Sequence, residues 1–405
     1  MHVTQPFPFT GTAGHKLDGR LELPRYGKPR ATAIFAHCFT CGKDSRAATT
    51  ITRALAERGI AVLRFDFAGL GGSEGDFSSF ATQVEDLCAA ADALAAAGYP
   101  PSLLVGHSLG GAAVIAASQQ LDGIAAVVTI GAPADTDHVL EHLGGKREEI
   151  MVDGEAVVRL GGRDFCVKKD FIENTAGQLQ QGRLEALDAP LLVLHSPTDD
   201  LVGIDNARRI FEAARHPKSF VSLDGSDHLL TDPAQATYAA KLIAAWSLRY
   251  VGEAEAAADP MPLDGTVRVE TAGGKFAQFV SFREHRLIAD EPVSYGGFDD
   301  GPTPYDLLLG ALGTCTAMTM QMYARHKNFP LDGVAVTLEH SRDHGADTHS
   351  DVEGGEARVE AIDLHLELVG PDLTEEQREK IFAIANKCPV HKTITGDLHI
   401  HQTHA

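Results

Sequence analysis

The sequence has few cysteines, no long apolar run and too few basic residues to balance its acidic ones. Six cysteines in 405 residues are too few for a disulfide framework, so we expect a reducing, cytoplasmic setting, where a close cysteine pair is more often catalytic than structural. The longest apolar run, around Ile124–Ile130, is far shorter than the roughly 20 residues of a membrane-spanning helix. A formal net charge of −21 argues against nucleic-acid and anionic-membrane partners.

What is present is typical of a soluble globular protein with more than one domain. The hydrophobic fraction is 44% and the charged fraction 22%. At about 100–200 residues per domain, the length predicts two or three domains. Met1–Thr10 shows no basic segment followed by an apolar stretch, so no secretory signal is expected.

Strand and helix patterns alternate through the front of the chain. Expected strands are 33–36, 61–65, 103–105, 126–130, 191–195 and 219–222, and expected helices are 49–58, 83–97, 110–120 and 234–249. This alternation predicts βαβ units and a mostly parallel, doubly wound sheet. The polar stretch 135–187 interrupts the pattern, so we expect a cap inserted over the carboxyl edge of the sheet.

A change of composition divides the chain. Residues 252–265 are small, acidic and proline-containing, which is typical of a linker between a domain at 1–251 and another at 266–405. The second domain is expected to be α+β. Its expected elements are strand-like alternation over 267–280, a long helix over 305–327, strands over 334–339 and 361–368, and a helix over 374–387 that opens with a capping box at Thr374.

The strongest chemical signal in the front half is a serine between two glycines. Gly106-His107-Ser108-Leu109-Gly110 follows the apolar segment 102–105 and precedes a helix rich in small residues. Small neighbours allow the sharp turn that lifts the Ser108 hydroxyl above the sheet. Asp199 and Asp200 follow a later strand and His228 follows the next, which gives the order Ser, Asp, His of a serine hydrolase.

These residues resemble the α/β-hydrolase family over roughly Phe9 to Tyr250. Residues 65–73 (FDFAGLGGS) are similar to the family's D-x-x-G-x-G-x-S turn, and 199–202 (DDLV) are similar to its acid motif, which implies Asp199 as the acid. His37-Cys38-Phe39-Thr40 stands at the family's oxyanion loop, with Cys38 in place of the usual glycine. The resemblance implies the backbone N–H groups of Leu109 and Phe39 as oxyanion donors.

Alternatives remain at two of these positions. Ser108 could be a turn residue in an inactive hydrolase. Cys38 and Cys41 could form a thioredoxin-like redox pair, but no helix begins directly after them to stabilise a thiolate, so packing beneath the oxyanion loop is favoured. Cys88 and Cys166 are expected to be buried and free.

Two separated cysteines carry the signal in the back half. Cys315 lies on the apolar face of the long expected helix, and Cys388 closes the last one in Asn386-Lys387-Cys388-Pro389-Val390-His391. If they meet in space, one thiolate can attack a peroxide and the other can resolve the product.

Residues from about Val267 to His401 resemble the OsmC/Ohr family of thiol-dependent peroxide reductases. The matching motifs are residues 301–308 (GPTPYDLL), the Cys315 helix and residues 386–392. The resemblance implies an intertwined α+β dimer, organic hydroperoxide substrates, Cys315 as the attacking thiol and Cys388 as the resolving one. The best-characterised branch has a glutamate after a proline where this chain has Tyr305. The activating arginine could be Arg268, Arg283 or Arg286.

A cluster of histidines and aspartates, His340, Asp343, His344, Asp347, His349 and Asp351, is interpreted as a hairpin loop rather than a metal site. His399, His401 and His404 are expected in a final strand and tail.

The sequence therefore predicts a bifunctional protein that acts on an acyl ester and an organic hydroperoxide, without cofactor or metal, and that forms a homodimer through its C-terminal domain. One alternative is a hydrolase fused to a non-catalytic dimerisation or ligand-binding module. A second is cofactor-free perhydrolysis by the same serine.

Overall fold

The computed structural model describes residues 2–38, 41–76, 79–135, 146–160, 163–169, 172, 180–251, 265–273, 275–283, 285–344 and 358–403. They form two compact units, Met1–Pro260 and Met261–Ala405. The boundary lies in the segment predicted to be the linker, most of which is outside the described residues. Each unit carries its own hydrophobic core.

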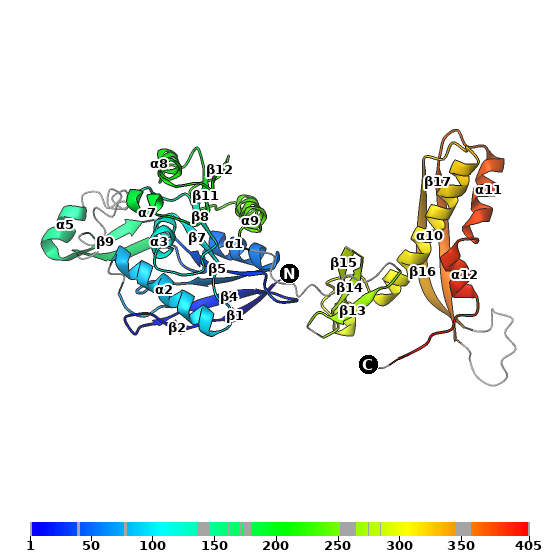
Figure 1. Cartoon of the computed structure of the whole chain (residues 1–405), viewed down its shortest axis with the longest axis horizontal. Coiled ribbons are helices and arrows are strands. Elements are labelled where there is room, and N and C mark those ends of the chain that lie inside the picture. The colour runs from blue at the N-terminus through cyan, green and yellow to red at the C-terminus, as the bar shows by residue number, and fades with distance from the viewer. Residues whose placement is uncertain are drawn as a thin grey trace. The chain divides into compact units, whose positions relative to one another are not determined.

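The first unit is built on an eight-stranded sheet in the order β1-β4-β6-β5-β7-β8-β11-β12 (Figure 1). Its strands are β1 (His2–Pro6), β4 (Gly19–Pro24), β5 (Ala31–Ala36), β6 (Ile60–Phe65), β7 (Leu103–His107), β8 (Ala126–Ile130), β11 (Leu191–His195) and β12 (Lys218–Ser222). Neighbouring strands pair in parallel along the series β6, β5, β7, β8, β11 and β12. At one edge of the sheet, β4 pairs antiparallel with β6 and with β1. The predicted doubly wound, mostly parallel sheet is confirmed.

Helices cover both faces of this sheet. The helices of this unit outside the insertion are α1 (Arg46–Ala56), α2 (Phe80–Ala96), α3 (Leu109–Ala117), α8 (Asp205–Ala213) and α9 (Pro233–Ser247). Side chains alternate between two cores, so Ile34 packs with residues of α2 and α3 while Phe35 packs with residues of α1 and α9. The carboxyl ends of the parallel strands are thereby held in fixed positions between two packed layers.

The stretch between β8 and β11 is an insertion with its own secondary structure. It contains α5 (Lys146–Asp153), the antiparallel pair β9 (Glu155–Leu160) and β10 (Arg163–Lys168), and α7 (Gln181–Glu185). The sequence predicts an insertion here but no strands. A second short pair, β2 (Phe9–Thr10) and β3 (Lys16–Leu17), lies near the N-terminus. No helix among the described residues is long and apolar enough to cross a membrane.

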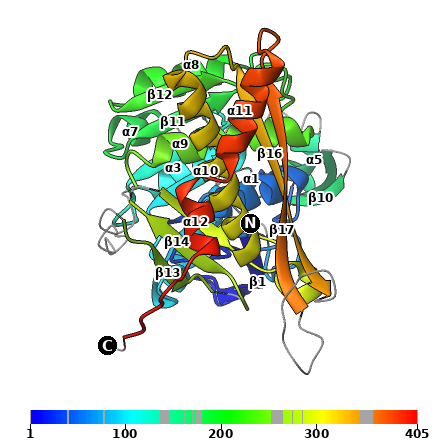
Figure 2. The same cartoon turned by 90° about the vertical axis from the view of Figure 1, so that its right-hand side faces the viewer.

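The second unit is α+β, as predicted. It contains a three-stranded antiparallel sheet of β13 (Arg268–Thr271), β14 (Gln278–Phe282) and β15 (His285–Ala289), the 3-10 turn η1 (Val293–Tyr295), and the hairpin β16 (Gly333–His344) and β17 (Arg358–Val369). Its helices are α10 (Pro304–His326), α11 (Glu375–Ala385) and α12 (Pro389–Thr395). The long α10 packs against β16, α11 and α12 (Figure 2). Thr374 caps α11 in a capping box, as predicted.

Several local predictions for this unit are wrong. His340, Asp343 and His344 lie in β16 rather than in a loop, because the hairpin extends further than the apolar pattern indicated. Cys388 does not close a helix, since α11 ends at Ala385 and Cys388 precedes α12. Residues 397–403 form no strand, so the prediction for His399 and His401 fails. Asp347, His349, Asp351 and His404 lie outside the described residues.

Candidate active site

Ser108 occupies a sharp turn between β7 and α3. Its φ of 55° and ψ of −125° place it in a backbone conformation that non-glycine residues seldom adopt. A Cβ atom on Gly106 would lie 2.3 Å from the Gly110 carbonyl oxygen, and one on Gly110 would lie 2.4 Å from the Ala36 carbonyl oxygen. Larger residues would therefore force the turn open. The Ser108 side chain is half-buried at the carboxyl edge of the sheet.

The structure brings Ser108, His228 and Asp199 together in one hydrogen-bonded chain. Ser108 Oγ lies 3.0 Å from His228 Nε2, and His228 Nδ1 lies 2.7 Å from Asp199 Oδ2. Asp199 follows β11 and His228 follows β12, so neighbouring strands deliver both side chains to the same edge. His228 and Asp199 are buried. The hydroxyl can therefore pass its proton to a ring whose opposite nitrogen faces a carboxylate.

The surroundings of Asp199 distinguish it from Asp200. Burial would raise the pKa of Asp199, but the hydrogen bond with His228 and the backbone N–H groups of Val202 and Leu201 lower it below its ordinary value. Asp199 is therefore a carboxylate at neutral pH. Asp200 is exposed to solvent.

Two buried histidines support this chain, and the sequence analysis missed both. His107 Nε2 donates to the His228 carbonyl oxygen at 2.7 Å, and His195 Nε2 donates to the Val202 carbonyl oxygen at 2.7 Å. Burial lowers the pKa of His107 to about 4 and also lowers that of His195, so both rings are neutral. Their only sequence signal is that each ends a strand of the sheet, β7 and β11. The His107 ring thereby fixes the backbone at His228, and the His195 ring fixes the loop that follows Asp199.

Of the two backbone groups expected to act as oxyanion donors, one can be placed. Leu109 is the first residue of α3, so its N–H has no acceptor within its own helix. Phe39 lies outside the described residues. The loop that contains it is held at Lys43, whose backbone N–H and ammonium group both donate to Asp66. Asp66 begins the turn that resembles the family motif and also accepts from the Gly72 N–H.

Cys38 and Cys41 are joined in a disulfide at the start of this loop. Packing of free thiols beneath the loop, the interpretation favoured from the sequence, is therefore wrong, because the backbone turn brings the two residues into bonding range. Cys38 is buried and Cys41 is half-buried. Cys88 is free and half-buried, and the side chain of Cys166 lies outside what the structure describes.

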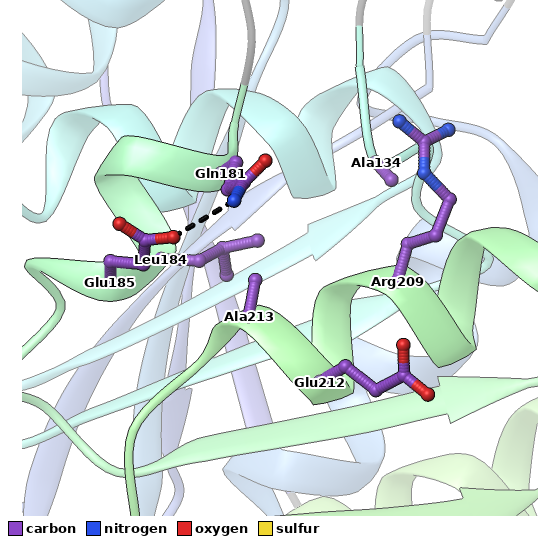
Figure 3. Close-up of a pocket in the computed structure, with 7 residues that line it drawn as sticks. All are labelled: Ala134, Gln181, Leu184, Glu185, Arg209, Glu212 and Ala213. Carbon is purple, nitrogen blue, oxygen red and sulfur yellow. Dashed lines mark hydrogen bonds between the residues drawn. The ribbon is translucent and has the colours of Figure 1, made fainter.

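A cavity of about 390 Å³ lies between α7 and α8 in the first unit (Figure 3). Its lining residues are Ala134, Gln181, Leu184, Glu185, Arg209, Glu212 and Ala213. Gln181 donates to Glu185 at 2.9 Å on one wall, and Arg209 on the other pairs with Asp135 at 2.8 Å. The lining does not include Ser108, His228 or Asp199, so the cavity does not itself hold the reacting atoms.

In the second unit, Cys315 on α10 and Cys388 before α12 meet as free thiols. The Cys388 Sγ takes a hydrogen bond from Cys315, another from Thr316 Oγ1 at 3.5 Å and a third from the His391 backbone N–H at 3.2 Å. Burial would raise the pKa of Cys388, but these hydrogen bonds lower it. The two cysteines, whose meeting the sequence left open, are therefore in contact.

The residues considered as activators of these thiols have contacts of their own. Tyr305, at the family's glutamate position, stacks on His340 with ring centroids 4.3 Å apart, and His340 Nε2 lies 2.6 Å from Glu360 Oε2. Of the candidate arginines, Arg268 pairs with Glu270 at 2.6 Å, and Arg286 lies 3.7 Å from the centre of the Phe279 ring. The third, Arg283, turns the chain between β14 and β15 with a φ of 49°.

No group of three or more histidine, cysteine or acidic side chains suited to a metal ion occurs within the described ranges.

Comparison with family models identifies both parts of the chain. Residues 33–241 match the model described as the alpha/beta hydrolase family, and residues 297–402 match the model described as OsmC-like protein. The search of curated proteins found no match.

Solved structures resemble the first unit. The crystal structure of the esterase domain from a Rhodothermus marinus protein is 47% identical, with a TM-score of 0.53. The match covers 62% of this chain and all of that one. Est1E from Butyrivibrio proteoclasticus, solved with ferulic acid bound, is 22% identical over 60% of this chain and 98% of that one, with a TM-score of 0.53. This second likeness shows the fold alone.

Proposed function

Because the chain belongs to the alpha/beta hydrolase family and carries an OsmC-like domain after it, we propose that its first unit is a serine esterase that works through an acyl-enzyme. The observation that carries this proposal is the continuous hydrogen-bonded chain from Ser108 Oγ through His228 to Asp199. The 47% identity to a solved esterase domain supports the ester as the substrate class.

In the proposed reaction, Ser108 Oγ attacks the ester carbonyl carbon while His228 Nε2 removes its proton. Asp199 holds the Nδ1–H of the ring and stabilises the imidazolium that forms. The N–H groups of Leu109 and Phe39 donate to the oxyanion of the tetrahedral intermediate. His228 then gives its proton to the departing alcohol, and a water molecule activated by the same ring releases the acid.

The proposal is tested by removing the nucleophilic hydroxyl of Ser108 and measuring ester turnover in a variant that still folds. Ser108→Ala should lower kcat for an activated ester such as 4-nitrophenyl acetate by about 10⁴–10⁶-fold, as loss of one member of such a unit does in other hydrolases. Asp199→Asn should reduce activity far more than Asp200→Asn, because only Asp199 contacts His228. Circular dichroism checks the fold. Retained activity in Ser108→Ala would overturn the nucleophile, and equal effects at 199 and 200 would overturn the acid.

We propose that the second unit reduces organic hydroperoxides with its thiol pair. The Cys315 thiolate attacks the terminal peroxide oxygen, the O–O bond breaks, and an alcohol leaves with a sulfenic acid on Cys315. Cys388 then attacks the Cys315 sulfur, which releases water and leaves a disulfide between the two. The contact between the two free thiols supports the formation of a disulfide between them, and the lowered pKa of Cys388 supports the second step, in which Cys388 attacks.

We also propose that the second unit is a homodimer. Met318 and Met322, one turn apart on α10, are 61% and 70% exposed, and Val293 and Tyr295 of η1 are exposed as well. Two large apolar side chains exposed one turn apart on a helix, with further exposed apolar residues on η1, are typical of surfaces that another chain covers.

A further inference from the structure

The two thiols of the second unit differ in what surrounds them. Cys388 Sγ accepts hydrogen bonds from Thr316 Oγ1 at 3.5 Å and from the His391 backbone N–H at 3.2 Å, and it also accepts from Cys315. Cys388 is 0% exposed, whereas Cys315 is half-buried. The negative charge of a thiolate is therefore supported at Cys388, and Cys315 is the sulfur that a reagent reaches first.

The hydroxyl group of Thr316 is the first of these donors, and it comes from α10. Thr314, on the same helix, donates to the carbonyl oxygen of Gly310, four residues earlier, as helical threonines commonly do. The Thr316 hydroxyl donates to the Cys388 sulfur, across the contact between α10 and α12. Thr316 and Cys388 are both 0% exposed, and a hydrogen bond to a charged atom is stronger when water is kept away from it.

The second donor is the backbone N–H of His391, in the first turn of α12. Cys388 is the N-cap of this helix, and an N–H group in a first helical turn has no acceptor within its own helix. The Cys388 sulfur supplies the acceptor. Because helices carry both donors, the hydroxyl and the N–H stay beside this sulfur whether it is a thiol or part of a disulfide.

We propose that the Thr316 hydroxyl and the His391 N–H make Cys388 the leaving group when a dithiol reductant reopens the oxidised pair, so that the reductant attacks Cys315. Thiol–disulfide exchange is faster when the departing sulfur is the more acidic one. The hydrogen bonds to Cys388 lower the pKa of its thiol. The inference rests on the proposed peroxidase, because it describes how the disulfide formed in that reaction is reduced again.

The proposed exchange takes place in two steps. One thiolate of the reductant attacks Cys315 Sγ, the S–S bond breaks, and its electron pair stays on Cys388 Sγ, where the Thr316 hydroxyl and the His391 N–H receive the charge. The second thiolate of the reductant then attacks its own sulfur in the mixed disulfide and releases Cys315, which takes up a proton. The cysteine pair gains two electrons, and the reductant ends as a disulfide.

The experiment follows reduction of the oxidised pair in the full-length protein. Diamide, which oxidises thiols without a peroxide, closes the disulfide between Cys315 and Cys388, and peptide mass spectrometry verifies the bond. Dithiothreitol then reopens it, and acid quenching followed by alkylation gives the rate. Thr316→Val keeps the shape of the side chain and removes the hydroxyl, so it should lower this rate by about three- to tenfold. Thr316→Ser should restore most of the rate.

Thr314→Val is the matched control, because the Thr314 hydroxyl bonds to the backbone of its own helix. This variant should be reduced at the parental rate, and circular dichroism checks that each variant is folded. Equal rates for the parent and Thr316→Val would overturn the proposal. A Thr316→Ser variant that is as slow as Thr316→Val would do the same, since the hydroxyl would then have no part in the effect.

A monothiol shows which sulfur is attacked. Glutathione is mixed with the oxidised protein, and the reaction is quenched with acid within seconds. The adduct should be on Cys315, with Cys388 left free for alkylation, and an adduct on Cys388 would overturn the proposal. If cumene hydroperoxide fails to close the disulfide that diamide closes, the proposed peroxidase is wrong, whereas the assignment of the leaving group is still decided by the rates and by the position of the adduct.

Discussion

Asp86 places a carboxyl group inside the first unit, on α2, where its Oδ2 accepts from the Ala68 N–H at 2.9 Å. Burial raises the pKa of this carboxyl from 3.8 to about 6. The folded protein therefore binds the Asp86 proton more tightly than the unfolded chain does. This contribution to stability is complete below about pH 4 and is lost as the pH rises through about 6.

Asp86→Asn should remove that pH dependence, because an amide keeps the acceptor oxygen and carries no charge. Between pH 4.5 and pH 8, the free energy of unfolding of the variant should rise relative to that of the parent by about 2 kcal/mol, because most of the shift of the Asp86 pKa, at 1.36 kcal/mol per unit, is lost in this range. The measurement is urea unfolding followed by fluorescence of Trp246, the single tryptophan, which lies on α9 and reports the first unit.

Asp92→Asn on the same helix is the matched control, since Asp92 is exposed. Its difference from the parent should stay nearly constant over this pH range. An Asp86→Asn difference that is equally flat would show that the Asp86 carboxyl titrates normally.

At this scale the sequence was enough to predict the residues of the proposed triad, but it did not reveal the two histidines that hold their loops in place. Ser108, Asp199 and His228 are recognisable because each follows a strand within a local motif. His107 and His195 act through backbone carbonyl groups 121 and 7 residues away, and no local pattern records such a partner. The bond between Cys38 and Cys41 was missed for another reason: it depends on the path of the loop.

Among the elements, α12 begins at a residue that is both a helix cap and a thiol of the proposed peroxidase. Cys388 is its N-cap, and its sulfur accepts from the His391 N–H. Serine is a strong N-cap residue, so Cys388→Ser should preserve the helix while removing the resolving thiol. With one equivalent of cumene hydroperoxide, the parent should form a Cys315–Cys388 disulfide, whereas the variant should accumulate sulfenic or over-oxidised Cys315 by mass spectrometry.

Cys315→Ser should consume no peroxide under the same conditions, and Cys88→Ser should behave as the parent. If Cys315 stays reduced in the parent while other cysteines oxidise, the second unit is not a peroxidase. A non-catalytic binding or dimerisation module is then the better description of it.

Apolar content decided which elements the sequence could predict. The buried strands β8 and β11 have the bounds expected from their unbroken apolar runs. Helix α8 was missed because only Ala207 and Ile210 are buried, which gives too little periodicity to recognise. The pair β9 and β10 was missed because it lies in the insertion and belongs to no regular βαβ unit.

At the scale of the whole chain, the two units differ in how much core they bury. The first has large cores on both faces of its sheet. The core of the second consists of Met320, Ala324, Leu373, Ile381 and Ala385 with partly buried neighbours. A unit of this kind needs further apolar surface to be covered, which agrees with the proposed dimer.

We therefore expect the full-length protein to be a homodimer and a fragment of residues 1–251 to be an active, monomeric esterase. Multi-angle light scattering measures both masses, and ester turnover checks the fragment. Met318→Lys with Met322→Lys should shift the full-length protein towards the monomer, because two buried charges would oppose association. A dimeric fragment or a monomeric parent would contradict this arrangement.

The small core of the second unit has a consequence for how the chain responds to its own abundance. When folding depends on association, stability follows mass action, and dilution acts as a denaturant. The first unit, with cores on both faces of its sheet, is expected to fold independently of concentration. If the proposed dimer and activities hold, a cell that makes little of this protein would retain the proposed ester chemistry and lose the proposed thiol chemistry, so the expression level would select between them.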